Sequence, residues 1–222
     1  MSVVTRIGLT PRRQGQLVRV LQAVMVGILL LGIWQFNMGV IMNAAVGLGV
    51  TFLPAVLERN FNFTLSVGIV LWITLAMFLH AFGTVPLPFL DFLSPYSATW
   101  WWDHMTHALS SSLVAAVAYA IVRALDEHTE FIAMPPKFLF AFMLLFVLAF
   151  GAIWELLEFY ISVVSGLLGA DTILTQYGLE DTILDLFYNS LGGVLVAIFG
   201  AASLSPVAEQ LRDRLDERSA ER

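Results

Sequence analysis

The 222-residue sequence contains no cysteine and few basic residues. Without cysteine the chain forms no disulfide bonds and has no thiolate nucleophile or thiolate metal ligand. Lys and Arg together number 11 against 17 Asp and Glu, so the formal net charge is −6, which argues against nucleic acid as a partner.

Hydrophobic residues are abundant instead, at 59 % of the chain, with a mean hydropathy of +0.82. Soluble domains are only about half apolar. Several continuous apolar runs approach the ~20 residues that a helix needs to cross about 30 Å of hydrocarbon. Strands of a membrane barrel would alternate apolar and polar residues over about 10 positions. The sequence therefore predicts an all-α, polytopic helical bundle in a membrane.

We expect one membrane domain over residues 1–204, followed by a charged cytoplasmic helix over residues 205–222. Ser205 and Pro206 are typical of the first positions of a helix, so the C-terminal helix is predicted to begin there. About six transmembrane helices are predicted from the apolar runs and the turn signals between them. Their approximate bounds are 17–36, 39–57, 63–82, 100–124, 137–163 and 181–203.

All positive charges fall on one side of the membrane in this six-span arrangement. The charges of the two terminal tails lie on the same side for a trivial reason, since an even number of spans places both ends there. Arg59, Arg123 and Lys137 are the sharper check, because all three lie at connections on that side. Cytoplasmic loops are enriched in Lys and Arg. We therefore expect a plasma-membrane protein with both termini cytoplasmic.

Other features concern anchoring and packing. Trp100, Trp101 and Trp102 would lie at the outer interface and form an aromatic belt. Ala45 and Gly49 are spaced like a small-xxx-small pair, which predicts close helix packing along that face.

Polar residues inside the spans gather near the outer side. They open the fourth span, occupy the last third of the fifth and open the sixth, all within about three turns of the outer boundary. Their spacing of three or four residues points those of each helix in one direction. An Asp at mid-bilayer costs ~2.5–3.5 kcal/mol, so we expect them in the bundle interior. The candidates are Asp103, His104, His107, Glu155, Glu158, Asp181, Asp185 and Asn189.

No Lys or Arg lies on this outer side to balance the carboxylates. Their negative charge must then be removed by protonation or balanced by a histidinium partner or a bound cation. Imidazole and carboxylate groups at this spacing suit a divalent metal such as Zn²⁺ or Mn²⁺, and an oxygen-dominated set suits Mg²⁺. Glu158 and His104 are expected to transfer protons, and His80 is a further candidate ligand. The predicted metal ligands are Asp103, His107, Glu155, Asp181, Asp185 and Asn189.

Three ordered motifs resemble those of the VanZ-like superfamily of small polytopic membrane proteins, especially its relatives with D-x-x-x-D in the last span. The similarity covers about residues 63–203 and implies a compact bundle with a polar cluster near one membrane face. Members often carry Arg before the last Asp, where this chain has Glu180, so the link to teicoplanin resistance is not carried over. The motifs are D-x-x-x-H at Asp103/His107, E-x-x-[EQ] at Glu155/Glu158 and D-x-x-x-N-x-x-G at Asp185/Asn189/Gly192.

The sequence leaves three functions open. The first is a metal-dependent hydrolase or transferase that acts on a lipid or a lipid-linked envelope substrate. The second is an ion- or proton-coupled transporter, although the acids cluster at one face and no inverted repeat is visible. The third is a non-catalytic protein whose polar core fixes helix packing. Membrane lipids are the expected partners, and the sequence gives no oligomeric state.

Overall fold

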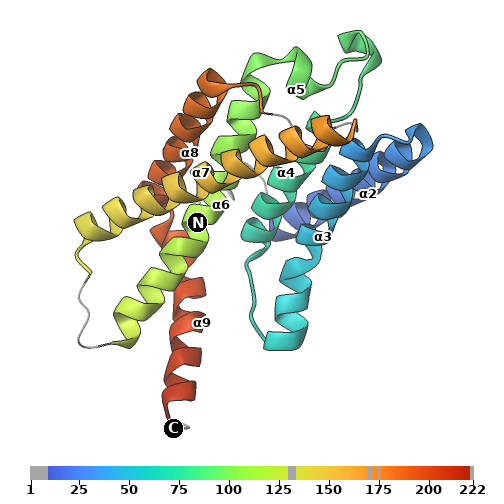
Figure 1. Cartoon of the computed structure of the whole chain (residues 1–222). Coiled ribbons are helices and arrows are strands. Elements are labelled where there is room, and N and C mark those ends of the chain that lie inside the picture. Colours follow the sequence, from blue (N-terminus) through green and yellow to red (C-terminus); the bar gives the residue numbers. More distant parts are fainter. Residues whose placement is uncertain (1–9, 130–133, 170–171, 175, 221–222) are drawn as a thin grey trace. The chain divides into compact units, whose positions relative to one another are not determined.

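The computed structural model describes residues 10–129, 134–169, 172–174 and 176–220. Within these residues every regular element is a helix, which confirms the all-α prediction (Figure 1). The elements are α2 (Pro11–Gln35), α3 (Met38–Phe61), α4 (Val67–Gly83), the 3₁₀ helix η1 (Pro88–Leu90), α5 (Pro95–Ala98), α6 (Trp100–His128), α7 (Pro136–Leu168), α8 (Leu179–Phe199) and α9 (Ala201–Ala220).

Five of these helices are long and apolar enough to cross a membrane, namely α2, α3, α6, α7 and α8. Helix α4 has 17 residues, or about 25 Å, which is close to the shortest length that spans hydrocarbon. Together with residues 88–98 it forms a sixth candidate span with a bend of 61°. The six predicted spans therefore correspond in order to α2, α3, α4, α6, α7 and α8.

Side-chain exposure is the inverse of that in a soluble protein. Large apolar side chains such as Leu30, Phe150 and Leu195 are exposed, whereas His104 and Asp185 are buried. Hydrocarbon solvates apolar surface well and charged groups poorly. The pattern agrees with helices that lie in a membrane.

The chain folds as two compact units. Unit 1 comprises residues 1–102 and 161–175, and unit 2 comprises residues 103–160 and 176–222. Unit 1 therefore contains α2 to α5, while unit 2 contains all of α8 and α9 and most of α6 and α7.

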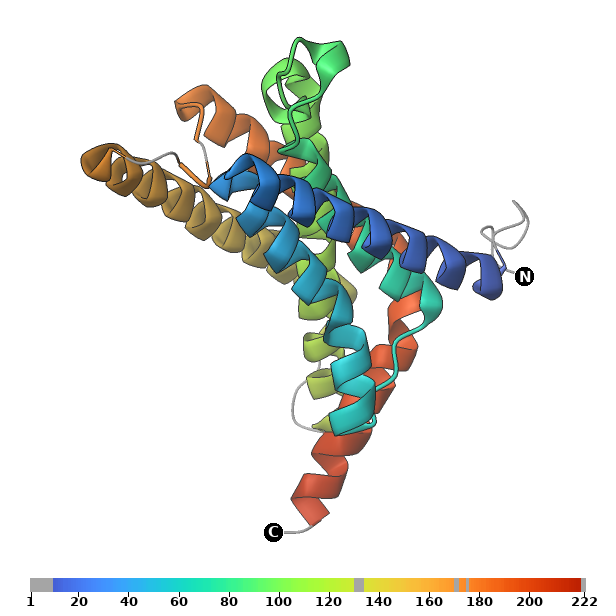
Figure 2. The same ribbon diagram turned by 90° about the vertical axis from the view of Figure 1, so that its right-hand side faces the viewer.

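In unit 1, helices α2, α3 and α4 lie side by side (Figures 1 and 2). Met25 and Ala44 are fully buried between them. Gly47 permits the close approach, because a Cβ atom there would lie 2.9 Å from Met25 Cε and 3.3 Å from the carbonyl oxygen of Met77.

The prediction that helices pack closely along Ala45 and Gly49 is wrong within this unit. Ala45 is exposed, and no described atom lies within 4 Å of a Cβ atom built at Gly49. Small residues recur at adjacent positions of α3, so Ala44 and Gly47 form a second possible face, one residue and about 100° away. Contact with α2 and α4 selects that second face.

In unit 2, α9 begins at Ala201, so the predicted helix start at Ser205 is wrong. Gly200 separates α8 from α9, and its carbonyl oxygen accepts the N–H groups of Ser203 and Leu204, both at 3.0 Å. The first turn is therefore formed before Ser205, and Pro206 lies inside the helix. Residues 201–203, predicted as the end of the last span, belong to α9.

Helix α9 packs against the end of α6 through charged groups. Arg212 Nη1 lies 3.5 Å from Glu127 Oε2, and His128 Nδ1 is hydrogen-bonded to Asp216 Oδ1. Leu204 of α9 is buried. The charged C-terminal helix is therefore a packed part of unit 2.

Candidate functional site

Three helices of unit 2 contribute polar side chains to one buried cluster. The residues lie in the first two turns of α6, in the second half of α7 and in the first three turns of α8. Six of them are buried, and Asp103 and Asp181 are partly exposed. The buried members are His104, His107, Glu155, Glu158, Asp185 and Asn189.

Asp185 lies at the centre of the cluster, with an exposed fraction of 0 %. Its Oδ1 atom lies 2.9 Å from Nδ1 of His104, at hydrogen-bonding distance. Its Oδ2 atom lies 3.8 Å from Nε2 of His107. The two oxygens of one carboxylate therefore face two different histidines.

Both histidines have a second neighbour. Nε2 of His107 lies 3.5 Å from Oδ1 of Asp103, one turn earlier on α6. The ring of His104 stacks on that of Tyr188, with 4.9 Å between centroids and an angle of 3° between planes. Tyr188 thereby holds the orientation of the His104 ring.

Helix α7 supplies two more carboxylates. Glu158 Oε1 accepts a hydrogen bond of 3.0 Å from Trp154 Nε1, one turn earlier. Glu155 Oε2 accepts one of 2.9 Å from the hydroxyl of Thr182 on α8. That hydroxyl accepts one of 2.9 Å from Gln176 Nε2. A chain of hydrogen bonds thus runs from the segment before α8 to a buried carboxylate.

Two buried carboxylate oxygens accept no hydrogen bond from the residues that the structure describes. They are Oδ2 of Asp185 and Oε1 of Glu155. Leaving a buried acceptor unsatisfied costs about 1–3 kcal/mol, and more for a charged group. Both oxygens therefore favour a proton or a bound cation as their partner.

Ligand atoms of the cluster fall into three overlapping sets, and within each set all lie within 4.8 Å of one another. Two of the sets share Asp185, and two share His107. Imidazole nitrogen with carboxylate oxygen is a donor combination that suits Zn²⁺ or Mn²⁺. The sets are Asp103–His107–Asp185, His104–Asp181–Asp185 and His107–Glu155–Glu158.

Asn189 lies one turn beyond Asp185 on α8 and is buried against α7. A Cβ atom at Gly151 would lie only 2.6 Å from Asn189 Nδ2. A Cβ atom at Gly192 would likewise overlap the carbonyl oxygen of Ala108 and the hydroxyl of Ser111 on α6. Two glycines thus bring the three helices into close contact beside the cluster.

The hydrogen bonds and ring contact described above also involve residues that were not among the sequence candidates, namely Trp154, Gln176, Thr182 and Tyr188. Trp154 and Tyr188 stand one turn from Glu158 and Asp185, a spacing that places them beside those carboxylates. Their aromatic character is equally typical of lipid-facing positions, so spacing alone did not single them out. His80 lies in unit 1, where its Nδ1 atom is 2.7 Å from the hydroxyl of Tyr96.

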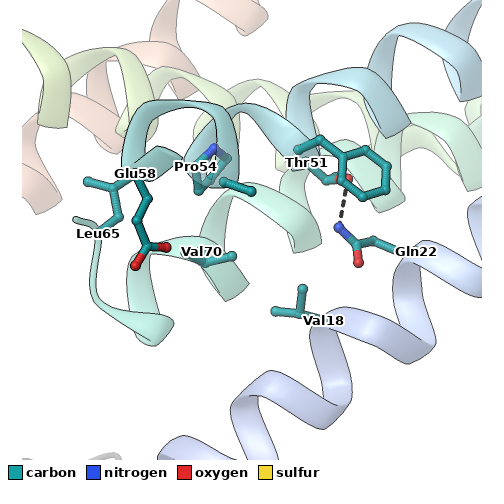
Figure 3. Close-up of a pocket in the computed structure, with 9 residues that line it drawn as sticks. Val18, Gln22, Thr51, Pro54, Glu58, Leu65 and Val70 are labelled. Atoms are coloured by element: carbon teal, nitrogen blue, oxygen red, sulfur yellow. Dashed lines mark hydrogen bonds between the residues drawn. The ribbon is translucent and has the colours of Figure 1, made fainter. Parts of the chain in front are cut away.

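Unit 1 also contains a pocket of about 280 Å³ between α2, α3 and α4 (Figure 3). Its walls are mostly apolar and include Val18 and Val70. Gln22 Nε2 donates a hydrogen bond of 3.1 Å to Thr51 Oγ1 at one end, and Glu58 lies at the other (Figure 3). With a single carboxylate and no histidine in its lining, this pocket lacks the ligands of a transition-metal site.

Comparison with known proteins supports the conclusion that this is a membrane protein. The family model described as "Predicted membrane protein (DUF2238)" matches residues 17–206. An uncharacterized protein of Thermotoga maritima is 30 % identical over 145 residues, which cover 64 % of this chain and 66 % of that protein. No solved structure matches the chain. Nothing in these matches points to the VanZ-like superfamily, so that resemblance stays a prediction.

Proposed function

The chain belongs to the DUF2238 family of predicted membrane proteins, and we propose that it is a metal-dependent enzyme acting on a lipid or lipid-linked substrate. The proposal rests on the surroundings of Asp185. Its carboxylate is fully buried between two histidines, and one of its oxygens accepts no hydrogen bond from the described residues.

A divalent ion fits best between Asp103, His107 and Asp185. Zinc lies about 2.0–2.2 Å from nitrogen and oxygen ligands, so two ligands of one tetrahedral ion are roughly 3.4 Å apart. His107 Nε2 lies 3.5 Å from Asp103 Oδ1 and 3.8 Å from Asp185 Oδ2. Both distances are within a few tenths of an ångström of that spacing, and all three ligand atoms lie within 4.8 Å of one another.

Glu155 and Glu158 are suited to proton transfer, because they share a ligand set with His107 without being needed for this first ion. In hydrolysis, the oxygen of water forms a bond to the electrophilic phosphorus or carbon while the bond to the leaving oxygen breaks. Glu158 accepts the proton of that water and returns it to the leaving oxygen, which balances the reaction. An ion at the adjacent site would polarise the bond under attack.

The depth of the site favours an amphiphilic substrate. Asp103 and His107 lie only ~5–10 Å along α6 from Trp100. Trp100 and Trp101 are exposed, as expected of residues at a membrane interface. The distribution of Lys and Arg argues for cytoplasmic termini in the plasma membrane, which would place the site near the outer face.

Elemental analysis of the full-length protein, purified in mild detergent without chelator, tests this proposal. We expect about one or more Zn or Mn ions per chain in the wild type and a loss of most of that metal in Asp185→Asn. Asp91→Asn is the matched control, because Asp91 is exposed and its left-handed backbone suits Asn. Equal metal in Asp185→Asn and the wild type would remove Asp185 from the site.

Activity needs a separate readout. The wild type, Asp91→Asn and Asp185→Asn would each be incubated with a membrane lipid extract and the bound metal, and the products compared by mass spectrometry. New products that require Asp185 support an enzyme. Metal without any Asp185-dependent product would instead favour a structural ion or a transported one.

A further inference from the structure

The carboxylate of Asp185 has the geometry of a bridge. Its Oδ1 atom faces His104 at 2.9 Å, and its Oδ2 atom faces His107 at 3.8 Å. In sites that hold two metal ions, the ions lie about 3.5–4 Å apart. A carboxylate shared by such a pair directs one oxygen to each ion, as the two oxygens of Asp185 would here.

Each histidine also belongs to its own ligand set. His107 is grouped with Asp103, whereas His104 is grouped with Asp181, and Asp185 is the member that the two sets share. Two ions could therefore be bound without any histidine being used twice.

We propose that the site binds two divalent cations that are bridged by Asp185. This inference rests on the proposed function and deepens it. The first ion is held by Asp103 and His107, and the second by His104 and Asp181. Oδ2 of Asp185 accepts no hydrogen bond from the described residues, and the first ion would supply the partner that this atom lacks. The second ion gives His104 the role of a ligand in place of proton transfer.

Charge supports two ions over one. The three ligand sets contain five carboxylates. No Lys or Arg occurs in residues 60–122 or 138–211, which include every member of those sets. If all five carboxylates are ionised, one divalent ion offsets two of the five negative charges, and two ions offset four. Since an ionised group inside a membrane is costly unless its charge is compensated, the nearly neutral arrangement is favoured.

A pair of ions also indicates the substrate class. Paired metal ions stabilise the attacking and leaving oxygens of an in-line displacement at phosphorus. The substrate is then an amphiphile with a phosphate ester or pyrophosphate group. Water oxygen bonds to phosphorus, the bond from phosphorus to the leaving oxygen breaks, and the proton passes through Glu158 to that leaving oxygen.

Titration of metal-stripped, full-length protein with Mn²⁺ tests the two-ion site. We expect two Mn²⁺ per chain in the wild type, with the electron paramagnetic resonance signal of a coupled pair. Asp181→Asn and Asp103→Asn should each bind one ion without coupling, and Asp185→Asn should lose the pair. Glu180→Gln is the matched control, because Glu180 is exposed beside Asp181 and lies outside the ligand sets of the described residues.

The outcomes separate this inference from the proposed function. One Mn²⁺ per chain in both the wild type and Asp181→Asn overturns the second ion and leaves a single-metal enzyme. Absence of Mn²⁺ from the wild type overturns both proposals. Two coupled ions that persist in Asp181→Asn overturn the assignment of Asp181.

Inorganic phosphate tests the substrate class. We expect phosphate to bind the two-Mn²⁺ wild type and Glu180→Gln at least 10-fold more tightly than Asp181→Asn loaded with Mn²⁺, as measured by calorimetry. Equal binding by all three proteins would overturn the inference that the paired ions recognise a phosphate group.

Discussion

His104 and Asp185 meet at 2.9 Å in the interior of unit 2, although 81 residues separate them in the chain. Helix α8 holds this histidine in two ways. Asp185 hydrogen-bonds its Nδ1 atom, and Tyr188, one turn further along α8, stacks on its ring. The position of the imidazole is therefore set by α8 although the residue belongs to α6.

Tyr188→Ala should weaken metal binding, because it removes the surface that orients His104. Loss of a residue that orients a ligand typically lowers metal affinity about 10–100-fold. Competition with a chromophoric chelator would measure the change. Tyr188→Phe keeps the ring and should bind metal like the wild type. If Ala and Phe at this position gave the same affinity as Tyr, stacking would have no part in the site.

Thr182→Val should destabilise the fold, since it removes the hydroxyl that donates to Glu155 Oε2 at 2.9 Å. Glu155 is buried, and its other oxygen accepts no hydrogen bond from described residues. Loss of such a donor costs about 1–3 kcal/mol. The measurement is the midpoint of thermal unfolding in detergent, in the absence of metal.

Thr182→Ser is the control for this change, because it restores a hydroxyl while losing only a methyl group. Its unfolding midpoint should lie close to that of the wild type. A midpoint for Thr182→Val equal to that of Thr182→Ser would show that the hydrogen bond contributes nothing to stability.

The sequence predicted the helices and the convergence of the polar residues for simple physical reasons. A membrane demands apolar runs of about 20 residues, which are visible without any tertiary information. Spacing by three or four residues then puts Asp103 and His107 on one side of α6, and it does the same for Asp181 and Asp185 on α8. These patterns are properties of single helices.

Contacts between helices could not be predicted in the same way. The ring of Tyr188 suits either a lipid-facing or a buried position, and only its neighbour His104 decides between them. Gly47, and not Gly49, faces α2, because α3 offers two overlapping rows of small residues. The start of α9 likewise depends on the carbonyl of Gly200, which competes with the local capping signal at Ser205.

Gly192→Ala should reduce stability and metal binding together. A Cβ atom at Gly192 would overlap the carbonyl oxygen of Ala108 and the hydroxyl of Ser111. A backbone oxygen cannot rotate away, so α6 and α8 would have to move apart at a typical cost of about 1–3 kcal/mol. Both helices carry predicted ligands, so we expect a lower unfolding midpoint in detergent and at least 10-fold weaker binding of Mn²⁺.

Gly166→Ala is the matched control, because a Cβ atom there has no described neighbour within 4 Å. Alanine has a higher helix propensity than glycine, so this variant should be as stable as the wild type or slightly more stable. Equal unfolding midpoints for Gly192→Ala and Gly166→Ala would contradict the close approach of α6 and α8.

The proposed orientation predicts which single thiol an impermeant maleimide can reach in intact cells. The natural chain has no cysteine, so Ser97→Cys and Asn60→Cys each introduce one thiol. Ser97 is exposed in α5, and Asn60 is exposed near the end of α3. We expect Ser97→Cys to be labelled in intact cells and Asn60→Cys only after lysis, because Lys and Arg cluster on the side of Asn60. The opposite result would place the metal site near the cytoplasm. Labelling of both residues from outside would show that α4, at 17 residues, does not cross the membrane.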